Sequence, residues 1–328
     1  MSQTNRKYNH SAKAKPNVTS YINRVIFDKY DTDILVDAAK AKQNVLILGP
    51  RGLGKTTLAE CAADILGQRL VTVPCHTGAR AENLIGQWVP NQQGAGYVWM
   101  DGLITQAVRN GHVLFLDEVN SLKPEVAFAI HGLLDHRREL VLTDKPGADG
   151  GPEVIQAHDK FFFIAAGNPF YEGVRVMNEA FRDRFAIQMV FNYVAEVDMK
   201  VLAEHPITRE MPDDMQIAVQ VFAEKIRAAC KKNAIHSDIS TRALLDLISN
   251  LKVHTFSVAR TMFVGRFDDS NEITAARAVF REVWDDRGKV LPTVLENASK
   301  ANIKPAPKGG RFKGSSPTAD TESAAATV

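Results

Sequence analysis

The segment 49–56 combines the residue types that hold phosphate groups. It reads Gly-Pro-Arg-Gly-Leu-Gly-Lys-Thr and matches the pattern G-x-x-x-x-G-K-[ST] in full. Its glycines let the backbone curl until several N–H groups face one point, where an anion is held. In this pattern the lysine reaches the β- and γ-phosphates, and the threonine hydroxyl is a ligand of Mg²⁺. A bound nucleoside triphosphate would therefore contact Gly49, Pro50, Arg51, Gly52, Leu53, Gly54, Lys55, Thr56 and Thr57.

A pair of carboxylates, Asp117 and Glu118, follows the apolar run 113–116. Ligands of open α/β sheets gather at the carboxyl ends of the strands. Asp117 would hold Mg²⁺ directly or through water, and Glu118 would orient and deprotonate the attacking water. Acidic residues also favour the N-terminus of a helix. Beside a phosphate loop, however, we interpret this pair as hydrolytic.

Four further polar residues at three places in the chain are candidates, with two interpretations at each place. Asn168 ends the apolar run 161–166 and would contact the γ-phosphate or position the water, or it forms a turn with Pro169. Of Arg182 and Arg184, one would complete a neighbouring subunit's site, or both form surface ion pairs. Arg242 follows a Ser-Thr pair that resembles a helix N-cap, and it points to the phosphates or to solvent.

Apolar runs and helical stretches must position these residues. Runs typical of buried strands occur at 45–48, 70–73, 113–116, 161–165 and 187–191, with helical stretches between them. Residues 57–66, directly behind the phosphate loop, have helical composition and end at Gly67, as a working loop requires. Such alternation predicts an α/β fold, in which helices cover both faces of a parallel sheet.

The chain divides by composition into four parts. After Tyr193 the strand-like runs stop and helical patterns dominate, which predicts a separate small all-helical domain. From about Ala301 on, Lys, Pro, Gly, Ser and Thr prevail, as in disordered tails. We expect a flexible arm over 1–18, a nucleotide-binding core over 19–193, a helical domain over 194–292 and a disordered tail over 293–328.

The overall composition is that of a globular protein. Of 328 residues, 45% are apolar and 24% charged, with a net charge of +2. This charge is too small to indicate a nucleic-acid or membrane partner. Three cysteines without metal-like spacing do not form a disulfide framework. Without an apolar run of membrane-spanning length or a signal peptide, we expect a cytoplasmic protein.

In their order along the chain, these motifs resemble the MoxR branch of the AAA+ ATPases, and within it the CbbQ, NorQ and GvpN group. The resemblance covers about residues 20–290, and the set of motifs with two insertions makes it specific. It rests on 49–56, 82–88, 101–103 with Gly111, 116–120, 133–140, 166–169, 181–185 and 240–242.

The resemblance implies an AAA+ αβα sandwich followed by a helical lid, with ATP and Mg²⁺ as cofactors. It places Asn168 at the sensor 1 position and Arg242 at the sensor 2 position. Arg184 corresponds to the arginine of the family's Asp-Arg-Phe ending. It is therefore the preferred arginine finger, the residue that would complete a neighbouring subunit's site, and Arg182 is the second candidate.

The same resemblance assigns two insertions. The stretch from Ala79 to Tyr97 corresponds to a pore-facing loop in the second core helix, and Glu139–Ala157 to a hairpin before sensor 1. Both would grip a substrate or partner protein. The aromatic side chains of Trp88, Tyr97 and Trp99 beside the first insertion could stack on nucleic-acid bases. We favour packing or protein contact for them.

The implied function is a ring-forming ATPase, expected to be a hexamer, that remodels or activates a partner protein. In this group the usual partner carries a von Willebrand factor A domain, and the client is a metalloenzyme or another complex. A separate protein would have to supply that domain. The alternatives are a DNA-directed AAA+ motor, the ATPase subunit of a metal chelatase, and a scaffold that does not hydrolyse ATP.

Overall fold

The computed structural model describes most of the chain. The described residues are 21, 23–26, 29–76, 78, 80–92, 94–168, 177–193, 200–202, 205–232, 234–235, 239–301 and 303–305. The predicted arm over 1–18, the tail beyond residue 305 and Pro169 lie outside them.

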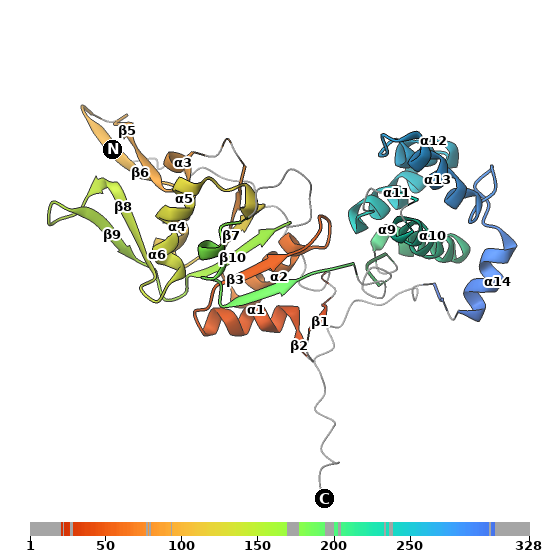
Figure 1. Ribbon diagram of the computed structural model, residues 1–328, viewed down its shortest axis with the longest axis horizontal. Coiled ribbons are helices and arrows are strands. Elements are labelled where there is room, and N and C mark those ends of the chain that lie inside the picture. The colour runs from red at the N-terminus through yellow and green to blue at the C-terminus, as the bar shows by residue number, and fades with distance from the viewer. Residues whose placement is uncertain are drawn as a thin grey trace, which may run out of the picture.

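A sheet of five parallel strands forms the centre of the N-terminal part (Figure 1). Across the sheet the strands run in the order β11-β3-β10-β7-β4, and all neighbours are parallel. Every residue of β3 and β10 is buried, because helices cover both faces. All five predicted runs form these strands: β3 (Val45–Leu48), β4 (Leu70–Pro74), β7 (Val113–Asp117), β10 (Phe162–Gly167) and β11 (Ile187–Val190).

Helices pack on both faces of the sheet and make an α/β/α sandwich. Val45 and Ile47 of β3 belong to a buried cluster with α1 (Asp31–Lys40) and α2 (Lys55–Leu66). Leu46 and Leu48 point to the other face, because successive side chains of a strand alternate. On that face lie α4 (Leu103–Asn110), α5 (Pro124–Ala129), α6 (His131–Leu134) and α7 (Glu179–Arg182). Two short strands, β1 (Val25–Ile26) and β2 (Lys29–Tyr30), precede α1.

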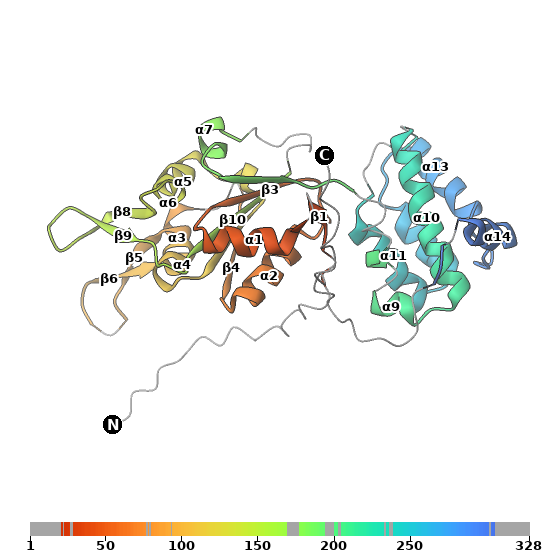
Figure 2. The same cartoon turned by 90° about the horizontal axis from the view of Figure 1, so that it is seen from below.

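Both predicted insertions contain antiparallel strands. The first consists of α3 (Ala81–Leu84) and a hairpin of β5 (Gly86–Pro90) and β6 (Tyr97–Asp101). The second is a hairpin of β8 (Glu139–Pro146) and β9 (Pro152–Gln156), with its turn in the glycine-rich segment 147–151. Figures 1 and 2 show both hairpins together at the end of the sandwich that faces away from the C-terminal helices.

The C-terminal part is helical, as predicted, and has a core of its own. Phe222, Phe280 and Trp284 pack at its centre, with the Phe222 and Phe280 ring centroids 4.4 Å apart. Among the described residues, none of the helices combines the length and apolar character needed to cross a membrane. The helices are α9 (Pro206–Arg209), α10 (Asp213–Lys231), α11 (Thr241–Val253), α12 (Phe256–Val264), α13 (Ser270–Arg281) and α14 (Pro292–Lys300).

Helix α14 corrects the predicted start of the tail. Residues 293–300 were expected to be disordered, but they continue a helix that Pro292 begins. Proline suits the first turn of a helix, where its missing N–H has no intrahelical partner to lose. Val294 and Ala298, one turn apart, bury their side chains against the helical core. The compositional bias of a tail therefore begins only after this helix.

Candidate active site

The phosphate-binding loop connects β3 to α2, and its backbone requires glycine. Gly52 and Gly54 have φ angles of +75° and +77°, which residues with side chains rarely adopt. Gly54 directly precedes α2, which begins at Lys55. The loop and the first turn of α2 therefore present their N–H groups, and the positive end of the helix dipole, to one space.

Lys55 lies inside this loop in a partly desolvated position. Its Nζ donates hydrogen bonds to the carbonyl oxygens of Gly49 and Pro50, both at 2.7 Å. Burial lowers the pKa of Lys55 to about 8, while the carboxylates of Asp117 and Glu118 act in the opposite direction. A buried ammonium group is stabilised by an anionic partner, which a phosphate group would supply.

Thr56 and Asp117 bring a hydroxyl and a carboxylate to one point. Asp117 ends β7, and its backbone carbonyl accepts a hydrogen bond from the N–H of Cys75 at 2.8 Å. Thr56 Oγ1 lies 3.4 Å from Asp117 Oδ2, near the ~3 Å that separates neighbouring oxygen ligands of octahedral Mg²⁺. Both are hard oxygen donors, so this pair fits Mg²⁺.

Glu118 turns out of the strand direction. Its backbone is left-handed, with φ 54° and ψ 42°, and positions of this kind in non-glycine residues concentrate at functional sites. Its N–H donates to Asp117 Oδ1 at 3.0 Å. Its carboxylate oxygen Oε1 lies 3.2 Å from the guanidinium of Arg51. The turn therefore directs the side chain of Glu118 toward the phosphate-binding loop.

The tip of β10 is hydrogen-bonded to the segments that follow its two neighbouring strands, β3 and β7. The N–H of Gly49 donates to the carbonyl of Gly167 at 3.1 Å. The N–H of Asn168 donates at 3.1 Å to the side-chain carbonyl of Asn120, a residue only 8% exposed. Sequence reasoning gave Asn120 no role, and its only signal was a polar residue soon after the Asp-Glu pair. The contact fixes Asn168 near Asp117.

One cavity of about 230 Å³ collects most of the predicted residues. Arg242 enters it from α11, whose N-cap Ser240 accepts a hydrogen bond from the N–H of Ala243 at 3.1 Å. A methyl group on Gly52 would lie 2.7 Å from Ser240 Cβ, so the helical part closely approaches the loop. The cavity is lined by Arg51, Gly52, Leu53, Gly54, Lys55, Thr56, Thr57, Asp117, Glu118, Ala166, Gly167, Asn168 and Arg242.

A buried network that sequence reasoning missed supports the loop from the other side. Tyr21 donates a hydrogen bond to Asp31 at 2.6 Å. Arg24 donates to the Tyr21 hydroxyl at 2.8 Å and to the carbonyl of Leu53 at 2.5 Å. The Arg24 guanidinium lies 4.6 Å from the ring centroid of Phe191. No sequence motif marks these residues, because only folding brings them to the loop.

The two predicted finger arginines lie elsewhere. Arg182 donates from Nε to Gln188 Oε1 at 2.9 Å. Arg184 lies 3.5 Å from Asp135, whose pKa is lowered to about 2 by hydrogen bonds from Arg137. Neither arginine is among the described residues that line the cavity. Within one subunit, the structure therefore does not bring them to the phosphate-binding loop.

Comparison with known proteins places this geometry in a family. Residues 44–185 match the AAA domain of the dynein-related subfamily. An uncharacterized protein of Staphylococcus saprophyticus is 31% identical over 264 residues, which cover 77% of this chain and 94% of that protein. An uncharacterized protein of Staphylococcus aureus is 32% identical over 249 residues, covering 74% and 90%.

Among solved structures, the RuvB Holliday junction branch migration motor of Thermotoga maritima aligns with a TM-score of 0.43 and 17% identity. The alignment covers 83% of this chain and 74% of that one. The segment that matches the AAA domain, residues 44–185, begins just before β3 and ends just before β11. It therefore includes the phosphate-binding loop and the Asp117–Glu118 pair. The chain belongs to the AAA+ ATPases, enzymes that hydrolyse ATP, and carries an AAA domain of the dynein-related subfamily.

Proposed function

We propose that this ATPase forms a ring, a hexamer of MoxR type, and uses ATP hydrolysis to remodel or activate a partner protein. The observation that carries the proposal is the composition of the cavity around Lys55. The ends of β7 and β10 and the phosphate-binding loop form its walls, and Arg242 of the helical part reaches into it. A site built in this way responds to the position of the helical part.

The roles within one subunit follow from charge and position. Lys55 and the loop N–H groups would bind the phosphates. Thr56 and Asp117 would hold Mg²⁺, which supplies positive charge where the phosphates carry negative charge. Glu118 would take a proton from the attacking water, and its ion pair with Arg51 holds the carboxylate beside the loop. Asn168, held by Asn120, would orient that water.

Arg242 would connect the chemistry to movement of the helical part. Its side chain is exposed within the cavity and comes from the first turn of α11. A γ-phosphate would attract this guanidinium, and its loss on hydrolysis would weaken the attraction. The angle between the sandwich and the helical part would then depend on the nucleotide, as a helical lid requires.

A ring would explain the position of Arg184. Its side chain is 34% exposed and lies 3.5 Å from Asp135 of its own subunit. An arginine presented in this way can complete the site of a neighbouring subunit and stabilise the charge of the transition state. Arg182, bonded to Gln188, is the second candidate.

The partner would bind at the two hairpins, and a separate protein would supply the von Willebrand factor A domain. The hairpins lie at the end of the sandwich away from the helical part (Figure 1). Movement driven by the nucleotide would therefore act on a client that is held at some distance from the cavity. In the cytoplasm, a metalloenzyme or a multi-subunit complex is the expected client.

The Glu118→Gln variant tests this function. It keeps the side-chain size but removes the base, so we expect ATP to bind and turnover to fall about a hundredfold or more. Pull-down of this variant in ATP and Mg²⁺ should retain an assembled ring with a client protein. The Lys55→Ala variant, which should not bind ATP, is the matched control.

Other results would favour other functions. Recovery of DNA alone, with ATP turnover stimulated by DNA, would contradict the proposal and indicate a DNA-directed motor. Copurification with a tetrapyrrole-binding subunit would indicate a metal chelatase.

A further inference from the structure

A cavity of about 480 Å³ lies between the two hairpins, roughly twice the volume of the one around Lys55. Residues of β6 and β8 form two of its sides, and residues of α5 and α6 also line it. Gly132 of α6 is needed for this arrangement, because a methyl group there would lie 2.6 Å from the carbonyl oxygen of Glu139. We name this space the hairpin groove.

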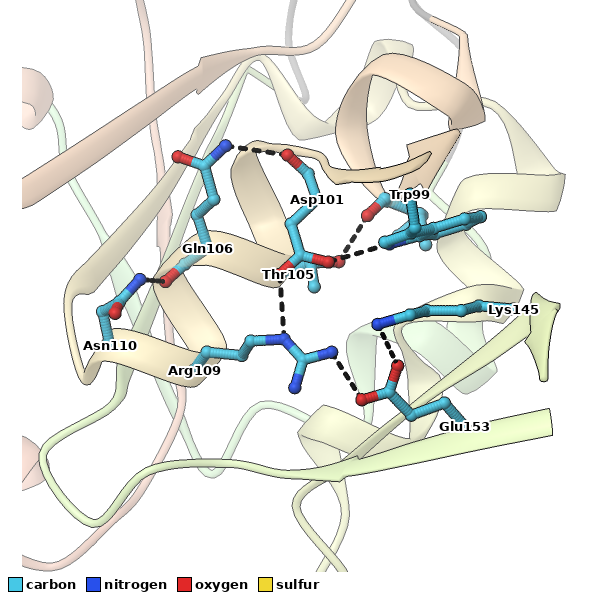
Figure 3. A network of polar contacts seen from close by, with 9 residues as sticks. Trp99, Asp101, Thr105, Gln106, Arg109, Asn110, Lys145 and Glu153 are labelled. Atoms are coloured by element: carbon cyan, nitrogen blue, oxygen red, sulfur yellow. Dashed lines mark hydrogen bonds and ion pairs between the residues drawn. The ribbon is translucent and has the colours of Figure 1, made fainter. Parts of the chain in front are cut away.

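A polar network holds the two hairpins in fixed positions (Figure 3). Arg109 of α4 pairs with Asp101 of β6 at 2.9 Å and with Glu153 of β9 at 2.7 Å. Lys145 of β8 pairs with the other oxygen of Glu153 at 2.6 Å. Hydrogen bonds from Lys145 and Arg109 lower the pKa of Glu153, so this carboxylate stays charged at neutral pH.

A direct bond between the hairpins adds to this network. Trp88 of β5 donates from Nε1 to the backbone carbonyl of Asp144 in β8 at 2.8 Å. The Trp88 and Trp99 rings meet edge to face, with centroids 5.6 Å apart. Groove walls that are held in place before binding lose little conformational entropy when a ligand enters. The hairpin groove is therefore a preformed site.

The charge of the groove is negative. Four carboxylates line it, on Glu82, Glu125, Glu139 and Asp144, against one guanidinium, that of Arg137. Arg137 is already paired with Asp135 at 2.6 Å. In the described part of the chain, no basic side chain lies within ion-pair distance of any of the four carboxylates. Burial lowers the pKa of His131, which keeps this neighbour neutral.

The groove also offers apolar surface. Phe128 of α5 is 64% exposed and Val141 of β8 is 38% exposed, although both are large apolar side chains. Trp99 also lines the groove and is partly buried against the core. Carboxylates around exposed aromatic surface are complementary to lysine and arginine, whose apolar stems cover rings while their charged ends meet carboxylates.

We propose that the hairpin groove binds a basic segment of the partner protein, with lysine or arginine side chains beside an apolar anchor. This inference rests on the proposed function, because it names the chemistry of the partner that the hairpins hold. The negative charge of the groove repels nucleic-acid phosphates, so a protein segment is the occupant that the charges favour.

Binding of a short fluorescein-labelled peptide of alternating arginine and leucine, followed by anisotropy with the full chain, tests the proposal. The triple variant Glu82→Gln, Glu125→Gln, Asp144→Asn removes three exposed carboxylates without changing side-chain size. We expect it to bind the peptide about tenfold more weakly. Added salt should weaken binding to the unchanged chain but have less effect on the variant.

A matched control removes the same number of charges at exposed positions of the helical part: Glu224→Gln, Asp268→Asn, Glu296→Gln. It should bind the peptide as the unchanged chain does. Equal binding by both triple variants, or tighter binding of a glutamate-leucine peptide, would overturn the proposal. Tighter binding of the basic peptide to a chain ending at Pro305 would overturn it too, and would assign the groove to the chain's own basic tail.

ATP turnover of the same preparations separates this inference from the proposed function. Loss of peptide binding does not depend on hydrolysis. A chain that hydrolyses ATP and assembles but ignores the basic peptide would refute only the inference about the groove.

Discussion

At the scale of single residues, Lys55 holds a positive charge that the protein makes easy to lose. Burial lowers its pKa to about 8, and the guanidinium groups of Arg24 and Arg51 act in the same direction, against the carboxylates of Asp117 and Glu118. A phosphate beside Lys55 stabilises the charged form, so nucleotide binding must raise this pKa. Nucleotide binding and proton binding are therefore coupled at Lys55.

This coupling predicts the pH dependence of nucleotide affinity. Above pH 8 the free protein loses the Lys55 proton, whereas the complex keeps it, so binding must take up a proton and weakens as pH rises. With these protonation states, affinity should fall about tenfold between pH 7 and pH 9. Titration with a fluorescent ATP analogue at constant ionic strength measures this. An affinity that does not change between pH 7 and pH 9 would contradict the assignment of this proton to Lys55.

At the scale of elements, the strands that could be predicted from the sequence are those in which consecutive residues are apolar and buried. β3, β7 and β10 are nearly continuous apolar runs, because both of their faces are covered. Helix α14 was not predicted, because only Val294 and Ala298 bury deeply and their spacing is a weak signal beside a biased tail.

Contacts between residues far apart in the sequence could not be predicted either. The bond from Trp88 to Asp144 and the contact of Asn120 with Asn168 join residues 56 and 48 positions apart. Local propensity and periodicity do not encode such pairs, since tertiary packing creates them. The phosphate-binding loop and the Asp117–Glu118 pair could be predicted because their chemistry is local in sequence.

Gly52 in the phosphate-binding loop and Gly67 at the C-terminal end of α2 distinguish the effect of backbone strain from that of contact with the helical part. Gly52 and Gly67 both have positive φ, +75° and +64°. A methyl group at Gly67 would meet nothing within 4 Å, whereas at Gly52 it would lie 2.7 Å from Ser240 Cβ. Each change to alanine should lower the free energy of unfolding by ~1 kcal/mol through strain alone.

Only Gly52→Ala should also disturb the site. We expect ATP affinity to fall about tenfold or more in this variant, because the loop and α11 must separate to admit the methyl group. Gly67→Ala should bind ATP normally. Thermal unfolding and nucleotide titration of both variants give the comparison, and equal ATP affinities would show that the approach of Ser240 to the loop is unimportant for binding.

At the scale of the whole molecule, the phosphate-binding loop lies between two parts with different tasks. Figure 2 shows the helical part on one side of the sandwich and the two hairpins on the other. Arg242 reaches the cavity from the helical part, and ion pairs through Arg109 connect the two hairpins on the opposite side. Arg184 belongs to neither, since it stays on the surface beside Asp135. The proposed ring assigns it a place, in the site of the next subunit.

Mixing two inactive variants tests whether sites are shared. In Arg184→Ala each subunit keeps its base but offers no finger, and in Glu118→Gln each offers a finger but has no base. Each variant alone should hydrolyse ATP at least about a hundredfold more slowly than the unchanged chain.

In a random one-to-one mixture, about a quarter of the sites would join an intact Glu118 to an intact Arg184 across a head-to-tail interface. Turnover should recover in proportion after the rings have exchanged subunits. A mixture of Arg182→Ala with Glu118→Gln is the control. If turnover is restored in this mixture and not in the one with Arg184→Ala, Arg182 is the arginine that completes the neighbouring site. No recovery in either mixture, with exchange verified by labelled subunits, would mean that each site is complete within one chain.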